Sequence, residues 1–186
     1  MISEFRRIGN MLFLSHLVDV SGGNLSVKTK DGVWITKTKK SLYNLRGKDI
    51  VKIPFEKNVA WNAASSEAAV HINIYKNIES AKAIVHAHPV NCIALSLKEK
   101  IIKPLDYEGS LFLGSVDVVD IEYDKWGKAK DVISSYFKSH PQKQIVAAKG
   151  HGVFAYADTL FDALTNVSAL ENSCKIIQTN AFGSAT

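Results

Sequence analysis

The sequence predicts an α/β protein whose sheet is largely antiparallel or mixed. Segments with apolar residues at helical spacing alternate along the chain with short segments of strand-like alternation. Two of the predicted strands are joined by an Asp-Gly pair, which favours a hairpin and therefore antiparallel pairing. With 186 residues, 46% of them hydrophobic, the chain is expected to form a single domain over residues 1–186 around one core.

The chain is expected to open with an amphipathic helix. Apolar residues recur there at intervals of three and four, which places them on one helical face. The helix is expected to end before the glycine-containing turn cluster at residues 20–24. The residues with this spacing are Phe5, Ile8, Met11, Leu12 and Ser15.

A β-hairpin is expected next. Residues 25–28 and 33–36 alternate like half-buried strands, and Asp31-Gly32 is the predicted turn between them. A basic stretch then occupies residues 36–52. We interpret it as a solvated face, and the alternative is a group of lysines that steers a phosphorylated molecule toward a nearby site. Its basic residues are Lys37, Lys39, Lys40, Arg46, Lys48 and Lys52.

The middle of the chain predicts a helix, a strand and a short helix. Serine is a good N-cap and glutamate complements the helix dipole, so Ser-Ser-Glu predicts a helix over residues 65–77. Residues 83–88 predict a strand that stops at Pro89, followed by a short helix over residues 90–97.

The C-terminal part predicts two strands and a long helix. Residues 144–149 and 153–156 have strand character and flank a Gly-His-Gly segment. The last helix is expected to open with Asp158 as its cap. Its predicted apolar stripe contains Leu160, Phe161, Leu164, Val167 and Cys174.

Bulk composition narrows the classes of function. The net charge of +5 attracts nucleic acid, anionic membranes and phosphorylated metabolites alike. No RNA-binding motif or zinc-finger spacing is present, so we expect no nucleic-acid partner. No apolar run reaches the roughly 18 residues of a membrane span, and the start of the chain lacks an apolar export signal, so we expect a cytoplasmic protein with no membrane partner. Cys92 and Cys174 are expected to be small core residues.

Three histidines predict a metal site. His86 and His88 stand two apart on a predicted strand, so their side chains project from the same face. His151 lies between two glycines, which allow sharp turning and close approach of a third imidazole. Three neutral imidazoles with an open fourth position make a catalytic zinc site. The remaining histidines are expected to be ordinary hydrogen-bonded residues: His16, His71 and His140.

Glu67 has two interpretations. It either stabilises the N-terminus of the predicted helix, which local sequence favours, or acts as a general acid/base beside the metal. Ser65 and Ser66 likewise either cap that helix or hold a phosphate through hydroxyl and free N–H groups. His71 follows Glu67 by four residues on the same helical face, so among the other histidines it is the one expected nearest the site.

Five short motifs follow one another in order. They are Ser-Gly-Gly-Asn-Leu-Ser-Val from Ser21, Ile-Thr-Lys-Thr from Ile35, Ser-Ser-Glu from Ser65, His-Ala-His-Pro-Val from His86 and Lys-Gly-His-Gly-Val from Lys149. Together they resemble the class II aldolase/adducin family over about residues 21–175. The resemblance implies a three-layer α/β/α subunit with a mostly antiparallel central sheet, assembled as a homotetramer with active sites between subunits.

The resemblance also implies roles for individual residues. His86, His88 and His151 would bind zinc, or manganese or cobalt, since imidazole suits several divalent metals. Glu67 would meet the metal in the resting enzyme and move a proton. Tyr107 falls where aldolases of the family have a tyrosine that handles the proton on the aldehyde oxygen. The residues implied in phosphate and substrate binding are Gly23, Asn24, Thr38, Lys39, Ser65 and Ser66.

The implied activity is that of a class II aldolase that converts a small phosphorylated ketose into dihydroxyacetone phosphate and an aldehyde. The metal would stabilise the enediolate as a Lewis acid, and Glu67 would transfer the proton at carbon. The alternative is a methylthioribulose phosphate dehydratase with Glu108 as base. A ribulose phosphate 4-epimerase ranks lower because such enzymes carry aspartate in place of Glu67. The three histidines disfavour a metal-free, adducin-type interaction module.

The chain departs from the aldolases of this family at three points. Lys39 and then Lys40 follow the Thr-x-Thr turn where those aldolases usually have glycine. An ammonium there either binds phosphate as a point charge or blocks close approach of the backbone. The C-terminal tail that closes the site is expected to be absent, and the segment between Tyr107 and His151 is shorter.

Overall fold

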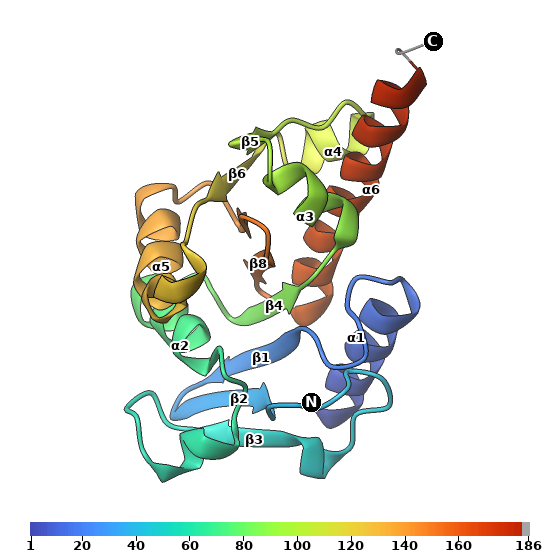
Figure 1. The fold of residues 1–186 in the computed structure, drawn as a ribbon. Helices are drawn as coiled ribbons and strands as arrows, with labels where there is room; N and C mark the ends of the chain where they lie inside the picture. Colours follow the sequence, from blue (N-terminus) through green and yellow to red (C-terminus); the bar gives the residue numbers. More distant parts are fainter. Residues whose placement is uncertain (184–186) are drawn as a thin grey trace.

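The computed structural model describes residues 1–183, which form an eight-stranded sheet flanked by helices (Figure 1). The strands are β1 (Asn24–Thr29), β2 (Gly32–Thr36), β3 (Ile50–Ile53), β4 (Ala83–Ala87), β5 (Ile101–Ile102), β6 (Val116–Val119), β7 (Ile145–Ala148) and β8 (Gly152–Ala157). The helices are α1 (Ile2–Leu14), α2 (Ala68–Asn77), α3 (Val90–Ser96), α4 (Tyr107–Phe112), α5 (Ala129–Ser139) and α6 (Leu160–Gly183). Short 3-10 turns are η1 (Gly47–Asp49), η2 (Val59–Ala63) and η3 (Tyr123–Lys128).

The sheet has the strand order β3-β2-β1-β4-β8-β7-β6-β5. Its neighbouring strands pair antiparallel, except for the parallel pair of β6 and β7. Helices α2 and α5 pack on one face, and α1, α3, α4 and α6 lie on the other (Figure 1). The predicted three-layer α/β/α fold with a mostly antiparallel central sheet is therefore confirmed.

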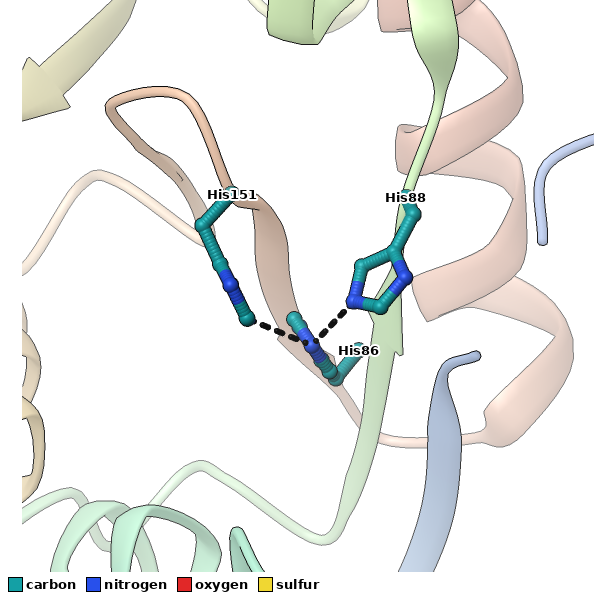
Figure 2. Close-up of side chains that lie close together, drawn as sticks. All are labelled: His86, His88 and His151. Atoms are coloured by element: carbon teal, nitrogen blue, oxygen red, sulfur yellow. Dashed lines mark hydrogen bonds between the residues drawn. The ribbon is translucent and has the colours of Figure 1, made fainter. Parts of the chain in front are cut away.

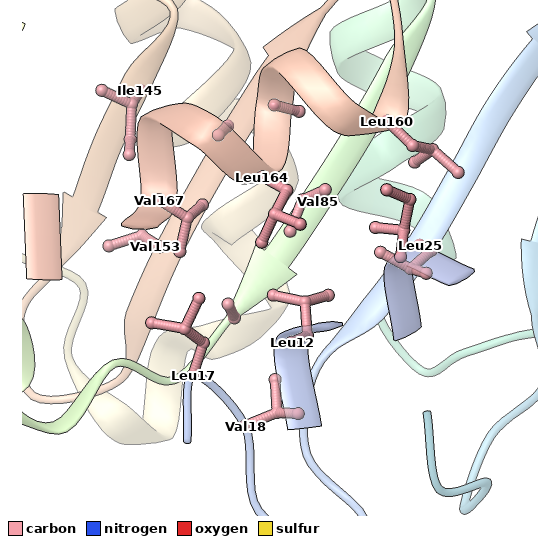
Figure 3. Packing of buried hydrophobic residues seen from close by; sticks show 14 of the residues in the cluster. Leu12, Leu17, Val18, Leu25, Val85, Ile145, Val153, Leu160, Leu164 and Val167 are labelled. Carbon is pink, nitrogen blue, oxygen red and sulfur yellow. The ribbon is translucent and has the colours of Figure 1, made fainter. Parts of the chain in front are cut away.

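Two apolar clusters fill the space between these layers. Because strand side chains alternate, Val85 of β4 packs into the cluster under α1 and α6, whereas Ile84 packs into the cluster under α2 and α5. Figure 3 shows Val85 beside Leu12 of α1 and Leu164 of α6. The centre of the sheet is thus buried on both faces, which gives the end of β4 a rigid support.

The predicted helices and strands of the first half form close to their expected bounds, with three corrections. Met11, placed on the apolar face of the first helix, is 37% exposed. The hairpin turn is formed by residues 30–31, because Gly32 already begins β2. The helix expected from residue 65 starts at Ala68, since residues 65–67 form a turn in which the N–H of Ala68 donates to the carbonyl of Ser65.

The start of α6 also differs from its prediction. Asp158 does not cap the helix, because its carboxylate binds Lys82. Thr159 takes that role, since its Oγ1 accepts a hydrogen bond from the N–H of Asp162 at 3.1 Å. Phe161, predicted on the buried stripe, is 43% exposed.

The interpretation of residues 36–52 as a solvated face is wrong for its last part. Residues 50–53 form the edge strand β3, whose Ile53 is fully buried. Asp49, just before the strand, is buried and accepts a hydrogen bond from the backbone N–H of Arg46. The end of this stretch is therefore part of the sheet and its core.

Cys92 and Cys174 are buried free thiols, in agreement with their prediction as core residues. Within the described residues 1–183, no helix has both the length and the apolar character that crossing a bilayer requires.

Candidate metal centre

The three predicted metal ligands converge at the end of β4. Nε2 of His86 lies 2.9 Å from Nε2 of His88 and 3.2 Å from Nε2 of His151 (Figure 2). His86 belongs to β4, His88 follows its last residue, and His151 lies in the turn between β7 and β8. One ligand atom from each residue lies within 4.8 Å of the others, so the group is compact enough to hold one ion.

Local backbone geometry explains why His151 reaches this point. β4 and β8 pair antiparallel, which places the start of β8 next to the end of β4. Gly150 has a φ of +67°, a conformation that favours glycine. A Cβ on Gly152 would lie 2.3 Å from the carbonyl oxygen of Ala87, so the two strands approach too closely for a side chain there. Both glycines flanking His151 are thus required, as the sequence suggested.

His86 presents a lone pair to the centre. Its Nδ1 donates a hydrogen bond to the carbonyl oxygen of Val153 at 2.8 Å, because a carbonyl can only accept. Burial lowers the pKa of His86 to about 3, so the ring is neutral and Nε2 carries no hydrogen. A backbone carbonyl that fixes the tautomer is a common outer partner of a metal-binding histidine.

Glu67 faces the same group of nitrogens. Its Oε1 lies 3.1 Å from Nε2 of His151, and its Oε2 lies 3.1 Å from Nε2 of His86. Burial opposes ionisation of this carboxyl, but its interactions with the two imidazoles, including a hydrogen bond from His151, outweigh burial and lower the pKa of Glu67 to about 2. The position immediately before α2 places the carboxylate here.

The donor set fits a divalent cation. The carboxylate oxygen Oε2 of Glu67 lies 3.1 Å from the lone pair on Nε2 of His86. These two groups repel each other unless positive charge lies between them. Three imidazoles with one adjacent carboxylate suit zinc, and also manganese or cobalt. The residues present are therefore compatible with the metal that the sequence predicted.

Two aromatic residues that the sequence analysis did not single out pack against the histidines. The ring of Phe154 stacks on His86 with centroids 4.1 Å apart, and Trp126 lies on His151 at 4.1 Å. Phe154 is the direct cross-strand neighbour of His86, so correct pairing of the two strands would have indicated it. No local sequence signal indicated Trp126, because η3 reaches His151 only in the folded chain.

A hollow of about 420 Å³ opens beside the three histidines. Its polar lining includes hydroxyl groups, lysines and the glycine-rich bend before β1. All the residues predicted to bind phosphate or substrate line it: Gly23, Asn24, Thr38, Lys39, Ser65 and Ser66. Lys37 and Lys40 add further positive charge, so this part of the basic stretch belongs to the candidate site.

The backbone around the hollow is constrained at two positions. Gly23 has a φ of +74°, and a Cβ there would meet Val18 at 2.5 Å and the carbonyl oxygen of His86 at 2.8 Å. Lys39 has a φ of +57° although it carries a side chain. Lys39 therefore keeps the backbone conformation that glycine adopts easily, while adding an ammonium to the site.

Tyr107 and Glu108 lie elsewhere in the subunit. Tyr107 is the first residue of α4 and is 80% exposed. Glu108 lines a separate hollow between α1, α4 and α6. Neither residue lines the hollow at the histidines, so a single chain does not bring them to the candidate site.

His71 and His140 are hydrogen-bonded, in agreement with their predicted ordinary roles. Nδ1 of His71 lies 2.6 Å from Oγ of Ser26, and Nδ1 of His140 lies 2.9 Å from the carbonyl oxygen of Tyr136. His71 also interacts electrostatically with Glu67, which agrees with its predicted proximity to the site.

Comparison with known proteins identifies the family. Residues 3–178 match the class II aldolase and adducin N-terminal domain. The chain belongs to this family, whose class II aldolases depend on a metal ion.

The chain is similar to several enzymes of known name. It is 31% identical over 177 residues to an L-fuculose phosphate aldolase of Methanocaldococcus jannaschii, with 95% of each chain covered. It is 27% identical over 181 residues to a 3-oxo-tetronate 4-phosphate decarboxylase of Escherichia coli, covering 94% of this chain and 84% of that one. The crystal structure of L-fuculose-1-phosphate aldolase from Thermus thermophilus superposes with a TM-score of 0.90 at 29% identity, covering 99% of this chain and 96% of that one.

Proposed function

We propose that the protein is a zinc-dependent class II aldolase that cleaves or forms a carbon–carbon bond in a small phosphorylated ketose, with dihydroxyacetone phosphate and an aldehyde as the cleavage products. The observation that carries this proposal is the meeting of three imidazole Nε2 atoms and the Glu67 carboxylate beside a basic hollow. Similarity to enzymes named L-fuculose phosphate aldolase supports a ketose phosphate as substrate.

The proposed chemistry divides between the metal site and Glu67. His86, His88 and His151 would hold a divalent ion, which would supply positive charge to stabilise negative charge on the substrate oxygens. Glu67 is ionised at neutral pH, as its lowered pKa indicates, so it is in the form that a general base requires. It takes the proton from the substrate carbon in synthesis and returns a proton to that carbon in cleavage.

The remaining residues of the hollow bind and orient the substrate. The hydroxyls of Thr38, Ser65 and Ser66 and the ammonium of Lys39 hold the phosphate through charge-assisted or neutral hydrogen bonds. Oδ1 of Asn24 is buried without a hydrogen-bond partner among the described residues, so it is available to a substrate hydroxyl.

We further propose that the enzyme is a homotetramer whose active site is completed by a neighbouring subunit. Tyr107 lies outside the hollow of its own chain and is 80% exposed, so its phenol is free to enter the site of another copy. Light scattering measures the assembly. Mixing inactive Tyr107→Phe and Glu67→Gln subunits should restore activity only if the two residues act from different chains.

Product analysis tests the reaction. The zinc-loaded protein is incubated with L-fuculose 1-phosphate and other ketose phosphates, and triose phosphate is detected by coupled reduction. Loss of water without chain cleavage would instead identify a dehydratase, a change of configuration alone an epimerase, and release of carbon dioxide from an oxo-acid phosphate a decarboxylase. The aldolase assignment also requires a larger loss of rate for Tyr107→Phe than for Glu108→Gln.

A further inference from the structure

A buried polar network joins α2 to β1, one turn beyond Glu67. Nδ1 of His71 lies 2.6 Å from Oγ of Ser26, which lies 2.8 Å from the hydroxyl of Tyr75. The Tyr75 hydroxyl also donates to the carbonyl oxygen of Ser26 at 3.0 Å. His71 is fully buried, so these contacts fix its ring between α2 and β1.

This network leaves the other nitrogen of His71 unused. Nε2 of His71 and Oε2 of Glu67 are both buried, and neither has a hydrogen-bond partner among the residues that the structure describes. Buried polar atoms without partners are rare, because each has lost its hydrogen bonds to water without a replacement. Two of them, one on α2 and one immediately before it, point to a contact that forms in another state of the site.

The two side chains are placed to meet. His71 follows Glu67 by one helical turn, and its backbone N–H donates to the carbonyl of Glu67 at 3.3 Å. The ring of Phe154 contacts both imidazoles, with its centroid 6.1 Å from that of His71 and 4.1 Å from that of His86. The direct connection of His71 to the candidate site is therefore to Glu67, with which it shares this backbone hydrogen bond.

We propose that His71 is a positioning residue whose Nε2 binds the Glu67 carboxylate whenever His151 does not hold it. The reason is that Nε2 of His151 can donate to Oε1 of Glu67 only while it carries a hydrogen, and it carries none when its lone pair binds a cation. His71 then supplies a fixed partner for Glu67. This inference rests on the proposed function, because that function requires Glu67 to reach the substrate with a defined orientation.

Two substitutions of similar size separate the two nitrogens of the ring. The amide of His71→Asn reproduces the Nδ1 side and keeps the contact with Ser26, but it removes the distal nitrogen. The amide of His71→Gln reproduces the distal nitrogen. We expect His71→Asn to lower kcat by about 10-fold or more with little change in KM, and His71→Gln to stay within about 3-fold of the parent, the range expected for outer partners of a metal site.

The decisive measurement is the visible absorption of the cobalt-loaded protein, which reports the ligands and geometry of the bound ion. The spectrum of His71→Asn should differ from that of the parent. The spectrum of the double variant should match that of Glu67→Gln alone, because the effect passes through Glu67. The proposal is overturned if His71→Asn matches the parent in spectrum and kcat. It is equally overturned if the spectral change persists in the double variant, or if both substitutions cause the same loss.

The cobalt spectra require no substrate, so they remain informative even if the protein cleaves no ketose phosphate. Absence of cleavage by the parent protein contradicts the proposed function and leaves the spectral comparison intact. Should His71→Asn fail to fold, Ser26→Ala tests the same idea by releasing the ring while keeping the imidazole. The Ser26→Ala substitution should shift the cobalt spectrum when Glu67 is present and leave it unchanged when Glu67→Gln is also present. An unshifted spectrum in the Ser26→Ala single variant overturns the proposal.

Discussion

Nδ1 of His86 donates a hydrogen bond to the carbonyl oxygen of Val153 at 2.8 Å, and this bond determines which nitrogen faces the candidate metal site. The donor lies on β4 and the acceptor on β8, so the pairing of these central strands orients the imidazole. Burial keeps the ring neutral by lowering its pKa. The protein therefore presents a lone pair at the site without first having to release a proton.

Glu67→Gln should separate catalysis from metal binding. The amide cannot transfer a proton, so we expect turnover to fall by about 10²–10⁴-fold while bound zinc is retained. His86→Ala should lose both turnover and bound zinc. Zinc content and initial rate are measured on the same samples, with the exposed Glu79→Gln as control. Unchanged turnover in Glu67→Gln would contradict the assigned role.

Zinc should stabilise the folded protein through the three histidines. An ion present at 100 times its dissociation constant adds about 2.7 kcal/mol to the free energy of unfolding. Thermal denaturation with zinc and after chelation should show this difference. His86→Ala should abolish it and His140→Ala should not, because His140 lies against Tyr136 and is not one of the grouped histidines. An equal zinc effect in both variants would exclude the proposed site.

Lys39→Gly should affect stability and substrate binding in opposite directions. Glycine adopts the φ of +57° without strain, so the free energy of unfolding should rise by about 1 kcal/mol. Loss of the ammonium should raise KM for the phosphorylated substrate by about 10-fold, the value of one charge-assisted hydrogen bond. Asn44→Gly, at a φ of +56° outside the hollow, is the matched control and should leave KM unchanged.

Gly23→Ala should destabilise the protein and disturb the metal site together. The new methyl would collide with Val18 and with the backbone of His86, at a φ that disfavours side chains. We expect a loss of about 1–3 kcal/mol in the free energy of unfolding and weaker zinc binding. Gly127→Ala meets nothing within 4 Å and provides the control. Wild-type stability in Gly23→Ala would show that this bend tolerates a side chain.

Stability of the metal-free protein should fall in mild acid because of His71. Burial lowers the pKa of His71 from 6.5 to about 4, so the unfolded chain binds a proton at a higher pH than the folded chain does. The neutral His71 ring therefore contributes to the free energy of unfolding above pH 6.5. This contribution, about 3 kcal/mol in total, is lost as the pH falls toward 4. Urea denaturation across this range should show a shallower pH dependence for His71→Asn; identical slopes would contradict the assignment.

Sequence patterns predicted the parts of the fold that depend on local spacing. The two-residue interval between His86 and His88, and the glycines around His151, anticipated a convergence that the structure contains. The final helix was also predicted, although its cap was assigned one residue too early. These features depend on backbone periodicity and glycine geometry, which the sequence displays directly.

Other features required the folded chain. The edge strand at Ile50–Ile53 is short and follows a basic stretch, so its apolar residues gave only a weak signal. The helix at Ala129–Ser139 was not assigned, although Ile133 and Phe137 lie one turn apart on a buried face. Contacts such as that of Trp126 with His151 arise from tertiary packing, which spacing along the chain does not reveal.

The separation of the histidines along the chain has a consequence for biosynthesis. His86 and His151 are 65 residues apart and meet only through the pairing of β4 with β8. A nascent polypeptide that has emerged as far as β4 offers two imidazoles and lacks the third. The complete group of three imidazoles therefore exists only after β8 has been synthesised and has paired with β4.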